Sequence, residues 1–192
     1  GRVMPAAAGR LDPSRHPWLA RGIPLAWGFA EATLFFVLPE MWITWVALHG
    51  LRQGMAAAAW VLAGALAGGI AVHLAAHWNQ MAVLALMERI PGIDAPLIMR
   101  AYDQLERHGW AGLLQGALGG VPWKLYATVA AGLDFGLPVF VVATAVARGL
   151  RFALFALAAW LVARWCPPRI GMGRLRLLWL AAWIAGCALH WA

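Results

Sequence analysis

The amino-acid sequence predicts an all-α integral membrane protein, with two re-entrant helical hairpins packed among about three transmembrane helices, plus interfacial amphipathic helices. Three observations lead to this fold class. Hydrophobic residues make up 63% of the 192 residues and charged residues only 12%, whereas soluble domains average about 45–50% and about 25%. Several apolar segments approach or exceed the length of about 20 residues that a membrane-spanning helix needs. Two others are broken by proline or glycine, which is typical of hairpins buried within a membrane protein.

The charge distribution also fits a membrane protein. The formal net charge is +7, and every basic residue except Lys124 is an arginine. Because these arginines flank apolar segments, we interpret them as topology signals and contacts to lipid headgroups, and we expect no nucleic-acid partner. Residues 1–21 contain four arginines and no apolar core of a signal peptide, so they are predicted to be a basic cytoplasmic segment.

The first apolar run covers residues 22–38, carries Glu31 near its middle and stops at Pro39. A second short apolar run, residues 41–48, follows Glu40. A helix, a break and another helix in this order predict a re-entrant hairpin, because broken backbone at membrane depth must be buried in protein or line a wet cavity.

Residues 55–78 predict a spanning helix, and Gly64 and Gly68 within it would let another helix approach closely. Residues 79–108 are much more charged and contain helix-breaking prolines and glycine. Their apolar positions fit amphipathic helices at the interface. These positions are Leu84, Met87, Ile98 and Leu105.

Residues 111–133 are apolar but broken at the centre, which predicts a second re-entrant hairpin with its tip near Pro122. The interrupting residues are Gly119, Gly120, Pro122 and Lys124. Residues 137–163 are long enough to span, and after a basic loop residues 175–192 form a last, shorter span.

The arginine-rich N-terminus and the 164–176 loop are both predicted to be cytoplasmic, which leaves the C-terminus on the other side. Two re-entrant hairpins and three spans satisfy this parity. A chain in which both hairpins span fully satisfies it as well, and charge counting does not separate the two topologies.

Arg148 and Arg151 are the sharpest functional signal, because they lie three residues apart near the middle of an apolar segment. An arginine at the bilayer centre costs about 2.5–3.5 kcal/mol even on the scale from insertion experiments. The guanidinium group matches phosphate bidentately, so one hypothesis is a site for a lipid phosphate. The alternatives are a structural salt bridge within the bundle, or a helix register that lifts both residues to an interface.

Three acidic residues lie inside or beside the predicted hairpins: Glu31, Glu40 and Asp134. A buried carboxylate that is balanced between desolvation and a nearby cation could bind and release protons. Simple pairing with an arginine or with Lys124 is the equally weighted alternative. Lys124, beside the predicted hairpin tip, could meet an anionic headgroup or merely neutralise an acid.

His73 and His77 are four residues apart on the predicted span, a spacing that could hold a metal, haem or pigment. No third ligand is identifiable, and polar rings are also expected near a helix end beside Trp78. We therefore expect no cofactor and no metal. The sequence has no P-loop, no nucleophile elbow and no zinc-protease motif, so we expect no enzymatic activity.

Three stretches resemble the DedA proteins, also called the VTT or SNARE-associated-Golgi-protein-like superfamily, and in particular its short bacterial branch. The stretches are AEATLFFVLPEMW from residue 30, the glycine-rich helix around Gly64 and Gly68, and HGWAGLLQGALGGVPWKLYATVAAGLDFGLPVFVVATAVARGLRF from residue 108. The resemblance covers about residues 22–165 and is strongest in the third stretch. Gly120 stands where the family usually has a proline, and His73 where a tyrosine is common.

The resemblance implies two re-entrant hairpins among spanning helices in a bacterial inner membrane. It also implies scrambling or flipping of a phosphate-bearing lipid, often with a proton requirement. Glu31 and Glu40 match the family's acidic hairpin residues, Lys124 its basic residue after the proline, and Arg148 and Arg151 its paired arginines. The expected units are then a basic segment (1–21), a DedA/VTT-like membrane domain (22–165), and a basic loop with a C-terminal helix (166–192).

A second function is weighed against lipid transport: a non-catalytic subunit of a larger membrane complex, respiratory or photosynthetic. The small residues of the 55–78 segment and the 13 tryptophans would then serve protein contacts. The partners expected are membrane lipids, and either further copies of this chain or a larger membrane complex.

Overall fold

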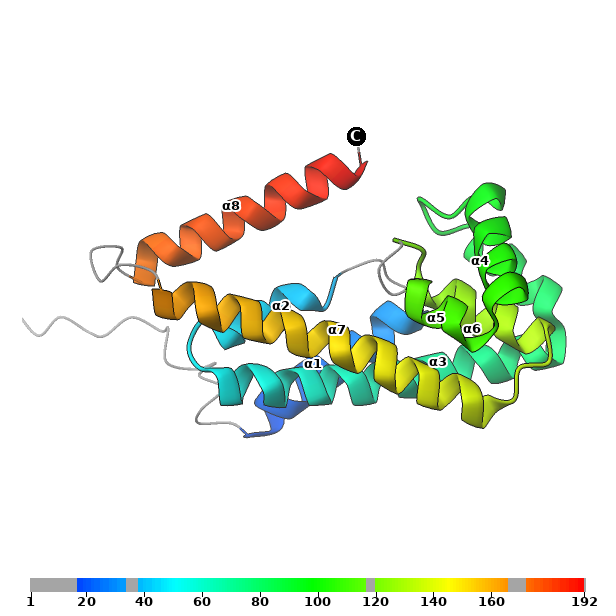
Figure 1. Ribbon diagram of the computed structural model, residues 1–192, viewed down its shortest axis with the longest axis horizontal. Coiled ribbons are helices and arrows are strands. Elements are labelled where there is room, and N and C mark those ends of the chain that lie inside the picture. Colours follow the sequence, from blue (N-terminus) through cyan, green and yellow to red (C-terminus); the bar gives the residue numbers. More distant parts are fainter. Residues whose placement is uncertain (1–16, 34–37, 117–119, 166–171, 192) are drawn as a thin grey trace, which may run out of the picture.

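The computed structural model describes residues 17–33, 38–116, 120–165 and 172–191, with the backbone alone for 17–20, 172 and 187–191. Every regular element in these ranges is a helix, which confirms the all-α class (Figure 1). The helices are α1 (Pro17–Thr33), α2 (Glu40–Ala47), α3 (Leu51–Met87), α4 (Ala95–His108), α5 (Trp110–Gly116), α6 (Trp123–Gly132), α7 (Leu137–Trp165) and α8 (Met172–Trp191).

A pair of helices separated by a break, followed by a long helix, occurs twice along the chain. The first set is α1, α2 and α3, and the second is α5, α6 and α7. Pro39 is the N-cap residue of α2, and Pro122 is that of α6. Proline lacks a backbone N–H and fixes φ, so both prolines mark the points where a new helix can begin. The two predicted helix–break–helix segments are therefore present.

The long helix α3 is the centre of the bundle, and it packs against α1, α2, α6 and α7. Its closest approach is to α1. A Cβ atom added at Gly64 would overlap the carbonyl oxygen of Leu25, and one added at Gly28 would overlap that of Val61. Gly68 faces Ala32 and Phe29 in the same way. The small residues of α3 thus bring two backbones into contact, as the sequence predicted.

The predicted end of the first span coincides with a kink in α3. Asn79 has non-helical angles (φ −153°, ψ 85°), and its Oδ1 accepts a hydrogen bond of 3.0 Å from the Ala82 N–H. The side chain of Asn79 thereby caps the following helical segment. At ~1.5 Å per residue, the straight part from residue 51 to 78 is about 40 Å long.

The helix α4 is amphipathic, in agreement with the sequence. Asp94 is its N-cap residue and accepts a hydrogen bond of 2.9 Å from the Leu97 N–H. Ile98, Ala101 and Leu105 form its buried face, whereas the charged residues of this helix are exposed. This face packs on α5 and α6, so α4 covers one side of the second hairpin.

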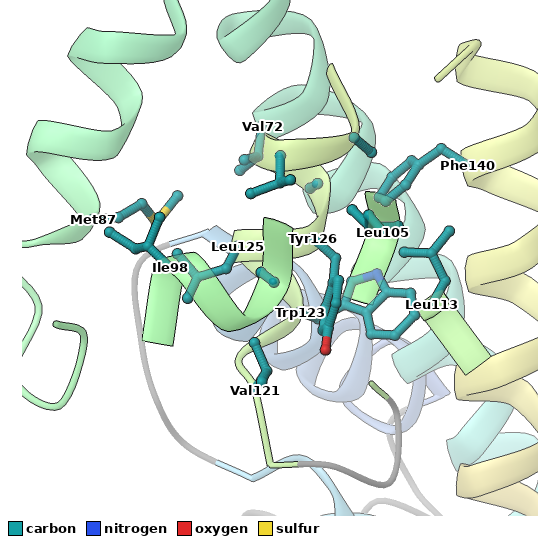
Figure 2. Packing of buried hydrophobic residues seen from close by; sticks show 14 of the residues in the cluster. Val72, Met87, Ile98, Leu105, Leu113, Val121, Trp123, Leu125, Tyr126 and Phe140 are labelled. Carbon is teal, nitrogen blue, oxygen red and sulfur yellow. The ribbon is translucent and has the colours of Figure 1, made fainter. Parts of the chain in front are cut away.

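The short helix α6 occupies the interior of the bundle. Every residue from 121 to 131 is buried, and α3, α4 and α7 all contact this helix. Leu125 and Tyr126 are fully buried in the main hydrophobic cluster, together with residues of the surrounding helices (Figure 2). A helix of ten residues leaves unsatisfied backbone groups at both ends, which explains why protein surrounds it.

Two of the described helices, α3 and α7, are long and apolar enough to cross a membrane. The helix α8 lies in the segment predicted as a third span, residues 175–192, and its crossing of a membrane stays a prediction. This helix stands apart from the bundle in Figure 1 and contacts mainly α2.

A small polar contact docks α8 on α2. The indole N–H groups of Trp179 and Trp183 both donate to the Thr44 hydroxyl, at 3.0 and 3.3 Å. Arg176 lies 2.9 Å from Nε2 of His49. The tryptophans of α8 therefore make specific contacts with the first hairpin.

Candidate functional site

Two carboxylates flank the break in the first hairpin. Glu31 lies in the last turn of α1, and Glu40 is the first residue of α2. The positive end of the α2 dipole favours a negative charge at Glu40. Because the chain breaks between α1 and α2, both acids are held near the same end of the hairpin.

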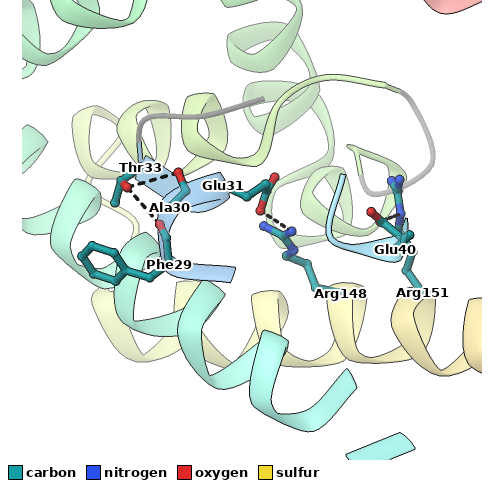
Figure 3. Close-up of polar contacts among 7 residues, drawn as sticks. All are labelled: Phe29, Ala30, Glu31, Thr33, Glu40, Arg148 and Arg151. Carbon is teal, nitrogen blue, oxygen red and sulfur yellow. Dashed lines mark hydrogen bonds and ion pairs between the residues drawn. The ribbon is translucent and has the colours of Figure 1, made fainter. Parts of the chain in front are cut away.

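The acids face Arg148 and Arg151 on the middle of α7 (Figure 3). Nη2 of Arg148 donates a hydrogen bond of 2.5 Å to Oε2 of Glu31. Nε of Arg151 lies 2.7 Å from Oε1 of Glu40. The three-residue spacing of the arginines puts both on one face of α7, so each half of the broken helix is fixed to α7 by its own ion pair.

In the first ion pair both side chains are largely buried, whereas in the second only the acid is. The side chains of Arg148 and Glu31 are 6% and 15% exposed. In the second pair Glu40 is 3% exposed, whereas Arg151 is 30% exposed. Removing one partner from a buried pair leaves an uncompensated charge, which is costly. Arg151 is the charge of this site with the readier access from outside.

Aromatic rings lie beside both guanidinium groups. The guanidinium carbon of Arg148 lies 5.1 Å from the ring centre of Phe152 and 5.9 Å from that of Trp123. The guanidinium carbon of Arg151 lies 5.7 Å from the ring centre of Phe155. Rings stabilise a cation through their π faces while they exclude water. The ion pairs therefore lie in apolar surroundings, where electrostatic interactions are strong.

Lys124 joins this group from the second hairpin. It is 1% exposed, at the start of α6, and its charge interacts with those of Glu31 and Arg148. The group thus holds three basic side chains and two acidic ones, and each acid is paired with an arginine. A local excess of positive charge favours an anionic ligand.

Some hydrogen-bonding capacity in the site is unused. Nη1 of Arg148 and Oε2 of Glu40 are buried and have no hydrogen-bond partner among the described residues. Buried donors and acceptors normally find partners. The site can thus donate to one more acceptor at Arg148 and accept one more hydrogen at Glu40.

The other predicted residues lie elsewhere. Asp134 is exposed in the turn after α6, at the opposite end of that helix from Lys124, with φ of 55°. Gly120 precedes α6 and has φ of 75°, and Pro122 begins that helix as predicted for a hairpin tip. Gly119 lies outside the described residues.

The two histidines of α3 differ in their surroundings. His73 is 4% exposed and its ring stacks on Phe140, with ring centres 5.1 Å apart. His77, one turn later, is exposed. No three potential metal ligands of the histidine, cysteine or acidic types come together in the described part of the chain.

The aromatic residues of the site were missed in the sequence, although a signal for two of them is present. Phe152 and Phe155 each follow an arginine by four residues, which is the spacing of neighbours on one helix face. The contribution of Trp123 comes from another hairpin, and no local pattern indicates it.

Comparisons with known proteins found no match: no family model, curated protein or solved structure is significantly similar to this chain.

Proposed function

We propose that this chain is an integral membrane protein related to the DedA/VTT group, and that it moves a phosphate-bearing lipid across a bacterial inner membrane. Membrane insertion is supported by α7, whose outward face is a continuous apolar stripe. Its exposed residues recur every three or four positions: Val139, Val142, Val146, Leu150, Leu154 and Leu157. Soluble monomers rarely expose a contiguous patch of this kind.

The single observation that carries the lipid-transport proposal is the pairing of both halves of the first hairpin with Arg148 and Arg151. Ionised side chains at membrane depth are costly and are mostly functional. These two lie in the middle of α7 and face acids at the end of α1 and the start of α2, and Lys124 is a third basic side chain near them. A phosphate group matches this chemistry, because guanidinium groups bind its oxygens in pairs.

Proton coupling follows from the arrangement of the acids. A phosphate that meets the unused Nη1 of Arg148 and then binds the guanidinium group bidentately takes Nη2 from the carboxylate of Glu31, which would then be a buried charge without a partner. Protonation of that carboxylate removes this cost. Glu40 offers a second position for a proton at Oε2, which accepts no hydrogen bond from the described residues. Lipid binding and proton uptake are therefore linked.

A vesicle assay tests this function. The purified protein is reconstituted with a fluorescent phosphate-bearing lipid, and the fraction accessible to an external quencher is followed over time. We expect Arg148→Gln and Arg151→Gln to slow lipid movement at least about tenfold, since each loses a charged contact. Because Arg151 is partly exposed, its variant tests function with a smaller effect on folding.

Arg164→Gln is the matched control, since Arg164 is an exposed arginine of the same helix that contacts Trp160. Its lipid movement should equal that of the unmodified protein. Undiminished movement in both site variants would rule out the proposed phosphate site.

A second function, the non-catalytic subunit of a larger membrane complex, is favoured by one observation. An open apolar groove of about 450 Å³ lies between α5 and α7, lined by Trp110, Leu114, Val142 and Val146 among others. A helix of another protein could pack there. Stoichiometric co-migration with a large complex in mild detergent, with no lipid movement by the isolated chain, would favour this function over transport.

A further inference from the structure

Three buried donors around Arg148 lack partners among the described residues: Arg148 Nη1, Trp123 Nε1 and Thr144 Oγ1. The residues that carry them are 5%, 5% and 0% exposed. A buried donor without a partner is energetically costly, so three in one region require an explanation. Their side chains belong to two elements, α6 and α7.

The three residues are neighbours. The Trp123 ring lies against the Arg148 guanidinium group, 5.9 Å from carbon to ring centre. Thr144 precedes Arg148 by four residues on α7 and is therefore on the same face, one turn away. Arg148 uses Nη2 for Glu31, which leaves Nη1 for a different acceptor.

The unpartnered hydroxyl of Thr144 is exceptional in this chain. The other three threonines, Thr33, Thr44 and Thr128, each donate to the carbonyl oxygen four residues earlier. This is the usual way in which a helix satisfies a buried threonine. Thr144 is equally helical and as fully buried as Thr128, but its hydroxyl makes no such bond. Its hydrogen-bonding capacity is thus available to a group from outside.

We propose that Arg148 Nη1, Trp123 Nε1 and Thr144 Oγ1 form a subsite for the oxygens of a phosphate group. All three can donate, and one of them is cationic, so an anionic oxygen complements them better than a neutral or cationic group does. This subsite adds Trp123 and Thr144 to the proposed lipid-phosphate site as specificity-determining residues. That the phosphate belongs to a lipid rests on the proposed function. The lipid headgroup and free phosphate share this chemistry.

Isothermal titration of the purified full chain in mild detergent tests the subsite. One titration uses dihexanoyl phosphatidic acid and the other inorganic phosphate. Trp123→Phe removes the N–H but keeps an aromatic ring beside Arg148, and Thr144→Val replaces the hydroxyl by a methyl group. Each variant should raise the Kd about tenfold, the effect of losing one hydrogen bond to a charged group. Binding of the lipid alone indicates a headgroup site, and binding of both ligands indicates recognition of the phosphate itself.

Two controls are matched to these variants. Thr128→Val removes an equally buried hydroxyl that bonds to Lys124 O, and Trp183→Phe removes an indole N–H that bonds to Thr44. Both should bind phosphate like the unmodified protein. Without ligand, Thr144→Val should unfold at the same or a higher temperature, because an unpaired buried hydroxyl has been removed.

The outcomes separate the subsite from the transport activity. An unchanged Kd in Trp123→Phe and Thr144→Val overturns the subsite and assigns the three donors to bound water, whether or not lipid moves. Weaker binding by both variants supports the subsite even if the unmodified protein moves no lipid in vesicles, in which case the proposed function alone fails. Absence of any phosphate binding by the unmodified protein overturns the subsite.

Discussion

Arg148→Ala is expected to lower the free energy of unfolding by about 3–5 kcal/mol. The variant leaves Glu31 with its side chain 15% exposed and without the guanidinium group that lies 2.5 Å away. Breaking a buried ion pair from one side typically costs this much, because the remaining charge is neither solvated nor paired. It also removes a cation from between the rings of Trp123 and Phe152.

Replacing both partners of the ion pair by uncharged residues should avoid most of this destabilisation. In Arg148→Met with Glu31→Gln no charge of the pair remains, and replacing both partners is often nearly neutral. Denaturant titrations in mild detergent on Arg148→Met, Glu31→Gln and the double variant would measure the coupling. Arg164→Ala is the control and should change stability little, because this side chain is exposed. A loss below about 1 kcal/mol for Arg148→Ala would show that the pair behaves like a solvated surface pair.

Gly64→Leu is expected to have an effect of similar size for a steric reason. A Cβ atom at Gly64 would overlap the Leu25 carbonyl oxygen, and the nitrogen of Phe29 would lie only 2.9 Å from it. Both neighbours are backbone atoms, so no rotamer change can relieve the overlap and α1 must move away from α3. Overpacking typically costs about 1–3 kcal/mol and occasionally more, and we expect about 3 kcal/mol here.

The displacement of α1 should also weaken the functional site, since α1 carries Glu31. Thermal unfolding and the vesicle assay would be run on the same preparation of Gly64→Leu, and both should show a loss. Gly22→Ala is the control: it changes a glycine of α1 around which no atom lies within 4 Å of an added Cβ. Gly64→Leu with the stability of the unmodified protein would contradict the close packing of α1 on α3.

Much of the fold was predictable because its signals are local. Pro39 and Pro122 stand at the starts of α2 and α6, where the broken apolar runs predicted that new helices begin. Gly64 and Gly68 indicated a close helix neighbour, but not that this neighbour is α1. The last span was predicted from length; a helix, α8, lies in that segment, and its crossing of a membrane stays a prediction.

The charged residues of the candidate site could be predicted from the sequence, but the ion pairs that they form could not. Arg148 and Arg151 share a helix face by spacing alone, and the candidate acids were few. Which acid meets which arginine depends on how α1 and α2 lie against α7, and no local pattern encodes this packing. Asp134, like Glu31, is an acidic residue inside or beside an apolar segment, but in the structure it is exposed in the turn after α6.

The proposed mechanism is that a lipid phosphate replaces the Glu31 carboxylate on the guanidinium group of Arg148. The measurement that tests it most directly is the uptake of protons on lipid binding. The protein would be titrated with dihexanoyl phosphatidic acid in weakly buffered detergent solution near neutral pH, and the pH change compared with that of Glu31→Gln. If the exchange occurs, the unmodified protein takes up protons in proportion to the lipid bound, and Glu31→Gln takes up clearly fewer. Lipid binding with equal proton uptake in both proteins, or with none in either, would contradict it.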